Sequence, residues 1–65
     1  MKVGQKVQLL AEFSGVPAGT VGKVVEVEAG GSLYLVEWML PGRDARQAIR
    51  HLLTAEEVQK LVRPL

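Results

Sequence analysis

The chain has 65 residues and a mass of 7.1 kDa, enough for one small domain, since domains usually contain roughly 50 to 250 residues. Hydrophobic residues make up 48% and charged residues 23%, a composition that allows a packed core and excludes a disordered chain. With no Cys and a single His, the sequence excludes a disulfide framework, and we expect no metal and no cofactor. Its apolar runs are too short to cross a membrane and no basic-then-apolar leader begins it, so we expect a cytoplasmic protein without membrane contact.

The formal net charge is +1, too close to zero for a protein whose main function is to coat nucleic acid. The charges are unevenly spread along the chain. Residues 1–42 carry three Lys against four Glu, and residues 43–65 carry five Lys or Arg against three Asp or Glu. Asn is missing and Asp occurs once, a scarcity of heat-labile side chains that indicates a thermophilic source.

The first predicted strand covers residues 6–12, where apolar and polar residues alternate as in a half-buried strand. Its apolar face carries Val7 and Leu9. Two glycines and a proline then predict a turn-containing loop, whose apolar residues Phe13 and Val16 are expected near the core.

The second and third predicted strands cover residues 21–28 and 33–38, and a short Gly-Gly turn joins them into a hairpin. The doublet Val24-Val25 breaks the alternation and predicts a bulge near Gly22. We expect Gly19 and Gly22 to provide positive φ or close backbone contact where the second strand starts. They do not form a phosphate-binding loop, because no Gly-Lys-Ser/Thr ending and no helix follow.

Residues 46–53 follow a predicted turn at 39–45 and fit two structures. The spacing of Ala48, Ile49 and Leu52 is that of an amphipathic helix. A strand here would instead cover one of the exposed edges of a three-stranded sheet.

The sequence Thr54-Ala55-Glu56-Glu57 spells a capping box, in which the threonine hydroxyl and the last glutamate satisfy the first backbone groups of a helix. A short helical turn is therefore expected over residues 55–61. Pro64 limits it, and residues 62–65 can form a short fifth strand at an edge.

Four segments of the chain together resemble the small SH3-like barrels. They are Val3-Gly4-Gln5-Lys6-Val7, Ala18-Gly19-Thr20-Val21-Gly22-Lys23-Val24, Tyr34-Leu35-Val36-Glu37-Trp38 and Leu53-Thr54-Ala55-Glu56-Glu57-Val58. These include KOW-motif domains, the photosystem I accessory subunit, the nitrile hydratase β-subunit barrel and, closest in length, small uncharacterised bacterial proteins. The resemblance covers nearly the whole chain, and its motif is a signature of fold more than of function. In such barrels the segment before the last acidic turn is a strand, which favours a strand at residues 46–53. The expected fold is all-β, an SH3-like barrel of four to five antiparallel strands with one helical turn at 55–61.

Residues that could carry catalysis are few. The single His is His51, and the single Asp is Asp44. We expect His51 at the surface or the barrel rim and the three hairpin carboxylates, Glu26, Glu28 and Glu37, on a solvated face. A barrel of this size is filled by its own side chains, so the sequence predicts neither catalytic nor metal-binding residues and no enzyme.

Binding or scaffolding is the remaining class of function, with another protein as the first expected partner. Trp38 is expected in the core and Tyr34 partly buried. Apolar residues expected on the loop or on the outward faces of the strands form the candidate protein-binding surface: Leu10, Phe13, Leu35 and Met39.

Nucleic acid is the alternative partner, bound weakly by a basic rim as in KOW-like domains. The candidate residues are Lys23, Arg43, Arg46, Arg50, Lys60 and Arg63. The hairpin carboxylates oppose such binding, and no aromatic residues are interleaved with this set. We expect the chain to be a monomer or a weak homodimer.

Overall fold

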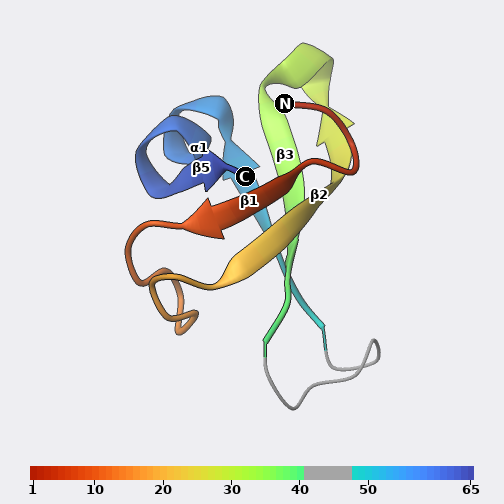
Figure 1. Cartoon of the computed structure of the whole chain (residues 1–65). Coiled ribbons are helices and arrows are strands. Elements are labelled where there is room, and N and C mark those ends of the chain that lie inside the picture. Colours follow the sequence, from red (N-terminus) through yellow and green to blue (C-terminus); the bar gives the residue numbers. More distant parts are fainter. Residues whose placement is uncertain (41–47) are drawn as a thin grey trace.

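Five antiparallel strands and one short helix make up the computed structural model, which describes residues 1–40 and 48–65 (Figure 1). The strands are β1 Lys6–Leu9, β2 Val21–Glu28, β3 Leu33–Trp38, β4 Ile49–Thr54 and β5 Val62–Pro64. The helix α1 spans Ala55–Leu61, and a 3₁₀ turn, η1, spans Ala29–Gly31. These elements confirm the predicted all-β class with a helical turn over residues 55–61. The predicted turn at 39–45 lies mostly outside the described residues.

The strands form one sheet in the order β4-β3-β2-β1-β5. Within the described residues the ladder does not close, because β4 and β5 are its two edges. The helix α1 connects these edges and contacts both, as well as β3 (Figure 1). The closure expected of a barrel is replaced by this helix, since the chain turns into α1 directly at the end of β4.

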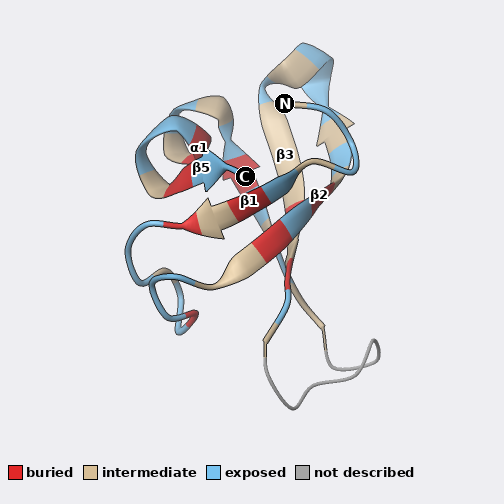
Figure 2. Cartoon of the chain, viewed as in Figure 1, coloured by how far each residue is buried: buried red, intermediate tan, exposed pale blue. Residues whose placement is uncertain are grey.

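The buried residues of the core come from all five strands of this curved sheet, from the β1–β2 loop and from α1 (Figure 2). Alternate residues of the strands point into it, as the period of two requires. The buried side chains are Val7, Leu9, Val16, Val24, Val36, Trp38, Leu53, Val58 and Val62. The predicted core position of Trp38 and the partial burial of Tyr34 are both confirmed.

The loop between β1 and β2 folds back onto the core, as expected. Phe13 and Val16 bridge each other through two backbone hydrogen bonds of 3.0 and 2.8 Å, and Val16 is fully buried. Phe13 packs against the core and meets the ring of His51 edge to face, with 5.2 Å between the ring centroids.

Strand β1 is shorter than predicted and ends at Leu9 instead of residue 12. The carbonyl of Leu9 still accepts from the N–H of Gly19 (2.7 Å), but the N–H of Leu10 donates to the carbonyl of Leu61 at 2.6 Å. The chain leaves β2 here because the N–H of Leu10 is bound by the last residue of α1, just before β5.

The bulge in β2 exists but lies between Val24 and Glu26, not near Gly22. One extra residue in β2 shifts the pairing with β3, so that Glu26 opposes Leu35 while Val24 opposes Val36. The shift accounts for the Val24-Val25 doublet that breaks the alternation in the sequence.

The segment before the helix is a strand over its described part, so the helical interpretation is wrong and the strand prediction is confirmed. All six residues of β4 pair with β3, from Ile49 opposite Trp38 to Thr54 opposite Leu33. The amphipathic spacing misleads because pairing with β3 satisfies a full row of backbone groups that an isolated three-stranded sheet leaves exposed.

Candidate functional site

The outward face of the sheet, opposite the core, carries a row of charges across four strands. The register places Lys6 opposite Lys23, Lys23 opposite Glu37, and Glu37 opposite Arg50. Arg50 Nη2 lies 2.9 Å from Glu37 Oε2, and Arg50 Nε donates to the same oxygen at 2.9 Å. We call these four residues the charge row.

Two cations of the charge row, Lys6 and Lys23, are direct cross-strand neighbours. Like charges at such positions destabilise a sheet, because their Cβ atoms lie only about 4.5–5.5 Å apart. Among the described residues neither lysine forms an ion pair. In the next row Arg63 donates two hydrogen bonds, of 3.0 and 2.7 Å, to Gln8 Oε1, which adds a cation to the same face.

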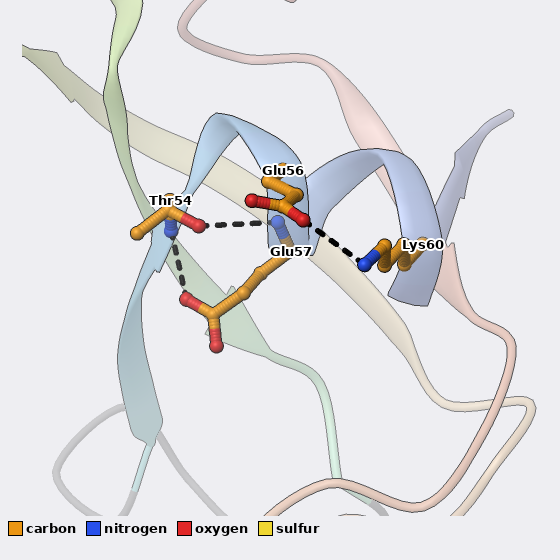
Figure 3. Close-up of polar contacts among 4 residues, drawn as sticks. All are labelled: Thr54, Glu56, Glu57 and Lys60. Atoms are coloured by element: carbon orange, nitrogen blue, oxygen red, sulfur yellow. Dashed lines mark hydrogen bonds and ion pairs between the residues drawn. The ribbon is translucent and has the colours of Figure 1, made fainter.

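This geometry brings together part of the predicted nucleic-acid set. Lys23, Arg50 and Arg63 share the outward face, whereas Lys60 lies on α1 and donates to Glu56 Oε1 at 3.0 Å (Figure 3). Arg43 and Arg46 lie outside the described residues. Sequence reasoning missed Lys6. The usable signal was its position on the polar face of the first predicted strand, since its neighbour Val7 is on the apolar face.

On one side of the charge row, two leucines face each other on the outward surface. Leu35 of β3 is directly opposite Leu52 of β4, and Leu52 is 52% exposed. Leu33, two residues before Leu35, continues the apolar surface along β3 and is half-buried. We call Leu33, Leu35 and Leu52 the leucine patch.

The four residues predicted to bind a protein do not form one surface. Of these, only Leu35 belongs to the leucine patch. Met39 lies beyond the charge row and, with Leu40 and residues 17–21, lines a shallow groove. Leu10 is exposed at the far end of β1, and Phe13 packs on the core.

Sequence reasoning missed Leu52 because it falls in the segment that also fits a helix. In the strand alternative, Leu52 and Arg50 lie on one face of the strand and His51 lies on the other. The structure has this arrangement. A prediction of β3–β4 pairing was therefore the signal needed to place Leu52 beside Leu35.

His51 is half-buried on the core face of β4, not at the outer surface. Its Nδ1 accepts a hydrogen bond of 2.8 Å from the Nε1–H of Trp38. One nitrogen of the only imidazole in the chain is therefore occupied by the polar atom of a buried indole, which is a structural role.

The hairpin carboxylates do not face one another. Glu37 is bound by Arg50, while Glu26 and Glu28 oppose the leucines of β3. Within residues 1–40 and 48–65 no group of three His, Cys, Asp or Glu side chains is placed to hold a metal ion. In the same part of the chain, no helix has both the length and the apolar character needed to cross a membrane.

A cavity of about 230 Å³ lies between α1, β3, β5 and the N-terminal residue. It is mainly apolar, and its lining residues come from the N-terminus, β3, α1 and β5: Met1, Tyr34, Ala55, Val58, Gln59, Val62 and Pro64. Tyr34 and Gln59 contribute its polar side chains.

No family model matches the chain, and neither a curated protein nor a solved structure matches it.

Proposed function

We propose that this protein is a non-catalytic binding module that binds another protein through the leucine patch. The observation that carries the proposal is the direct pairing of Leu35 with Leu52 on the outward face, with about half of Leu52 in solvent. Isolated exposed leucines are common on protein surfaces, whereas a contiguous apolar patch on a surface is typical of an interaction site. Here the exposed Leu52 lies beside the half-buried Leu33 and Leu35. The leucine patch also borders the edge of the sheet, where a partner can approach both the side chains and the backbone.

A photo-crosslinking side chain at position 52 tests this proposal in cells of the native source. The matched control is the same side chain at position 10, since Leu10 and Leu52 are 51% and 52% exposed. We expect a discrete crosslinked polypeptide from position 52 and none of comparable yield from position 10. Equal labelling from both positions, or no polypeptide adduct at position 52, would contradict the proposal.

Nucleic acid remains a second candidate partner because of the cross-strand pair Lys6–Lys23. Two adjacent cations without an ion pair among the described residues fit the repeating phosphates of a nucleic-acid backbone. Glu37 and Arg50 neutralise each other in an ion pair, so Arg50 adds little to the positive charge of this face. The expected binding is therefore weak, independent of sequence and strongly dependent on salt.

Titration of single-stranded and double-stranded oligonucleotides at several salt concentrations tests this candidate. Lys23→Gln should weaken binding and reduce the salt dependence, since one phosphate contact is lost. Lys60→Gln is the matched control, because Lys60 lies on α1 and is held by Glu56. Binding that is undetectable at low salt, or equally weakened by both variants, argues against a nucleic-acid partner.

The SH3-like assignment is likewise a proposal. Its support is the strand at Ile49–Thr54 directly before the acidic helical turn, where such barrels have a strand. Because this is a likeness of fold, the function rests on the leucine patch and not on the assignment.

A further inference from the structure

The outer edge of β4 has backbone groups that no described residue satisfies. The N–H of Ala55 donates to the carbonyl of Ser32 at 2.9 Å. In an antiparallel pair, the residues that bond the neighbouring strand alternate with those that point away. Ala55 bonds Ser32, so every second residue before it, Leu53 and His51, also bonds β3 through its backbone. The N–H and C=O groups of the residues between them, Arg50 and Leu52, point away from β3 at the edge of the sheet.

Within β4, which spans Ile49–Thr54, this free edge is short. At its C-terminal end the N–H of Thr54 donates to Glu57 Oε1 at 3.0 Å, and Thr54 is the N-cap of α1. The open part of the edge therefore comprises the four backbone groups of Arg50 and Leu52, with His51 between them.

The two edges of the sheet differ in their protection against pairing. Strand β5 has three residues and ends at Pro64, which has no N–H to donate. Strand β4 has six residues and contains no Pro and no Lys, and its pairing with β3 has no bulge. Its one charged side chain, Arg50, is bound to Glu37. Natural sheets usually protect such an edge, so an unprotected one indicates a strand-pairing site.

We infer that this edge pairs with β4 of a second copy of the chain, antiparallel and centred on His51. The inference rests on the proposed function, because it names the partner of the leucine patch. The free groups of Arg50 and Leu52 are symmetric about His51, so an antiparallel copy presents the same groups in reverse order. With Arg50 opposite the Leu52 of the other copy, all eight free groups of the two edges become paired, since the two residues of each bonded pair exchange both N–H···O bonds.

Two neighbouring registers of the same pairing are less favourable. Pairing centred on Arg50 places two guanidinium groups directly opposite each other, which is destabilising. Pairing centred on Leu52 directs Arg50 to Thr54 of the other copy, whose N–H is already bonded to Glu57. Of the three registers, the one centred on His51 pairs the free groups of Arg50 and Leu52 with one another and separates the arginines. It also brings the two Leu52 side chains into diagonal contact on the outward face, next to Leu35.

Sedimentation equilibrium from micromolar to millimolar protein tests the pairing. We expect a reversible dimer whose Kd rises at least about tenfold in Leu52→Lys, equivalent to ~1.4 kcal/mol. Leu10→Lys is the matched control, because Leu10 has nearly the same exposure and follows β1, which β2 and β3 separate from β4. Circular dichroism verifies folding, and Leu52→Thr replaces the lysine variant if the latter unfolds. A monomer at every concentration, or a dimer equally affected by both lysine variants, overturns the inference.

Cysteine cross-linking tests the register, since the chain has no Cys of its own. In the register centred on His51, residue 50 of one copy faces residue 52 of the other at about 5.5 Å between Cα atoms, within disulfide range. A mixture of Arg50→Cys and Leu52→Cys should therefore form mixed disulfide dimers faster than either variant alone, whose diagonal neighbours lie about 7–8 Å apart. Faster cross-linking of either variant alone overturns this register.

Binding through the leucine patch and pairing with a second copy can be contradicted separately. If the chain stays monomeric but position 52 is crosslinked to a different polypeptide, the leucine patch binds a partner and the self-pairing is wrong. If the chain stays monomeric and position 52 captures no polypeptide, both are wrong.

Discussion

The single tryptophan depends on the single histidine. Trp38 is 1% exposed, and its Nε1–H donates to His51 Nδ1 at 2.8 Å. An indole N–H buried without an acceptor costs free energy, so this hydrogen bond permits the largest core side chain to be buried completely. His51 also packs edge to face on Phe13, and thereby ties the β1–β2 loop to β4.

Replacing this acceptor should destabilise the fold. His51→Leu fills the position with an apolar side chain and leaves the Trp38 N–H unpaired, and we expect a loss of about 1–3 kcal/mol in the free energy of unfolding. His51→Gln should lose less, because its amide oxygen can accept. Urea unfolding followed by Trp38 fluorescence measures both. A leucine variant as stable as the glutamine variant would show that the hydrogen bond contributes little.

Gly22 is required by close packing of the core. A Cβ at this position would lie 2.7 Å from Trp38 Cε3 and 2.9 Å from Val36 Cγ1, distances that side-chain atoms do not adopt without displacement. The prediction of close contact at Gly22 is thus confirmed. The prediction of positive φ is confirmed at Gly19, whose φ is +89°.

Gly22→Ala should therefore destabilise the protein by about 1–3 kcal/mol, as overpacking of a core does. The clash is mainly with the six-membered ring of the indole. In a Trp38→Phe background the same substitution should cost less, and a double-mutant cycle by chemical unfolding with circular dichroism measures the difference. An equal cost in both backgrounds contradicts the steric explanation.

At the scale of elements, the junction of β4 and α1 is built on one residue. Thr54 is the last residue of β4 and the N-cap of α1. Its hydroxyl accepts from the N–H of Glu57 at 3.1 Å, and its own N–H donates to Glu57 Oε1 at 3.0 Å (Figure 3). This capping box confirms the sequence prediction, and it ends the strand and starts the helix at a single residue.

Thr54→Val removes the hydroxyl while keeping the shape and the β-branched character of the residue. We expect a loss of about 0.5–2 kcal/mol in unfolding free energy, the usual cost of losing an N-cap. Thr54→Ser keeps the hydroxyl and should be nearly neutral. Lys60→Ala, which breaks the exposed pair with Glu56, should cost no more than about 0.5 kcal/mol. Thermal and urea unfolding rank the three variants, and a valine variant ranked with the serine variant contradicts a capping role.

At the scale of the whole molecule, the charge distribution differs from the one read along the sequence. The chain divides into an acidic first part and a basic last third, which directs attention to the C-terminal segment. Folding instead places Lys6 and Lys23 from the first part on one face with Arg50 and Arg63 from the last. The basic character of this face comes from strand pairing, and the net charge summed along successive parts of the sequence does not predict it.

The cross-strand pair Lys6–Lys23 should lower stability in the absence of a ligand. Lys6→Gln is therefore expected to raise the free energy of unfolding by roughly 0.2–1 kcal/mol at low salt, and added salt should reduce this gain by screening the repulsion. Lys60→Gln, which loses an attractive partner, should show the opposite sign. Unfolding at low and high ionic strength measures both. A destabilising effect of Lys6→Gln at low salt is incompatible with repulsion between the two lysines.

Local chemistry determined most of the elements from the sequence alone. The bounds of β2 and β3 and the helix at Ala55–Leu61 follow from alternation, glycine turns and the capping box, which act between residues close in the chain. The core positions of Val7, Leu9 and Trp38 follow from the same period of two.

The tertiary structure alone decided what depends on partners distant in sequence. Pairing with β3 makes Ile49–Thr54 a strand despite its helical spacing. Capture of Leu10 by Leu61 shortens β1, and the helix between the two edges leaves the sheet open. The outward face was beyond sequence reasoning for the same reason, because Leu52 meets Leu35, and Lys6 meets Lys23, only through the register of the strands. A one-residue slip would point these side chains to the other face, so alternation along a single strand cannot predict which of them become neighbours.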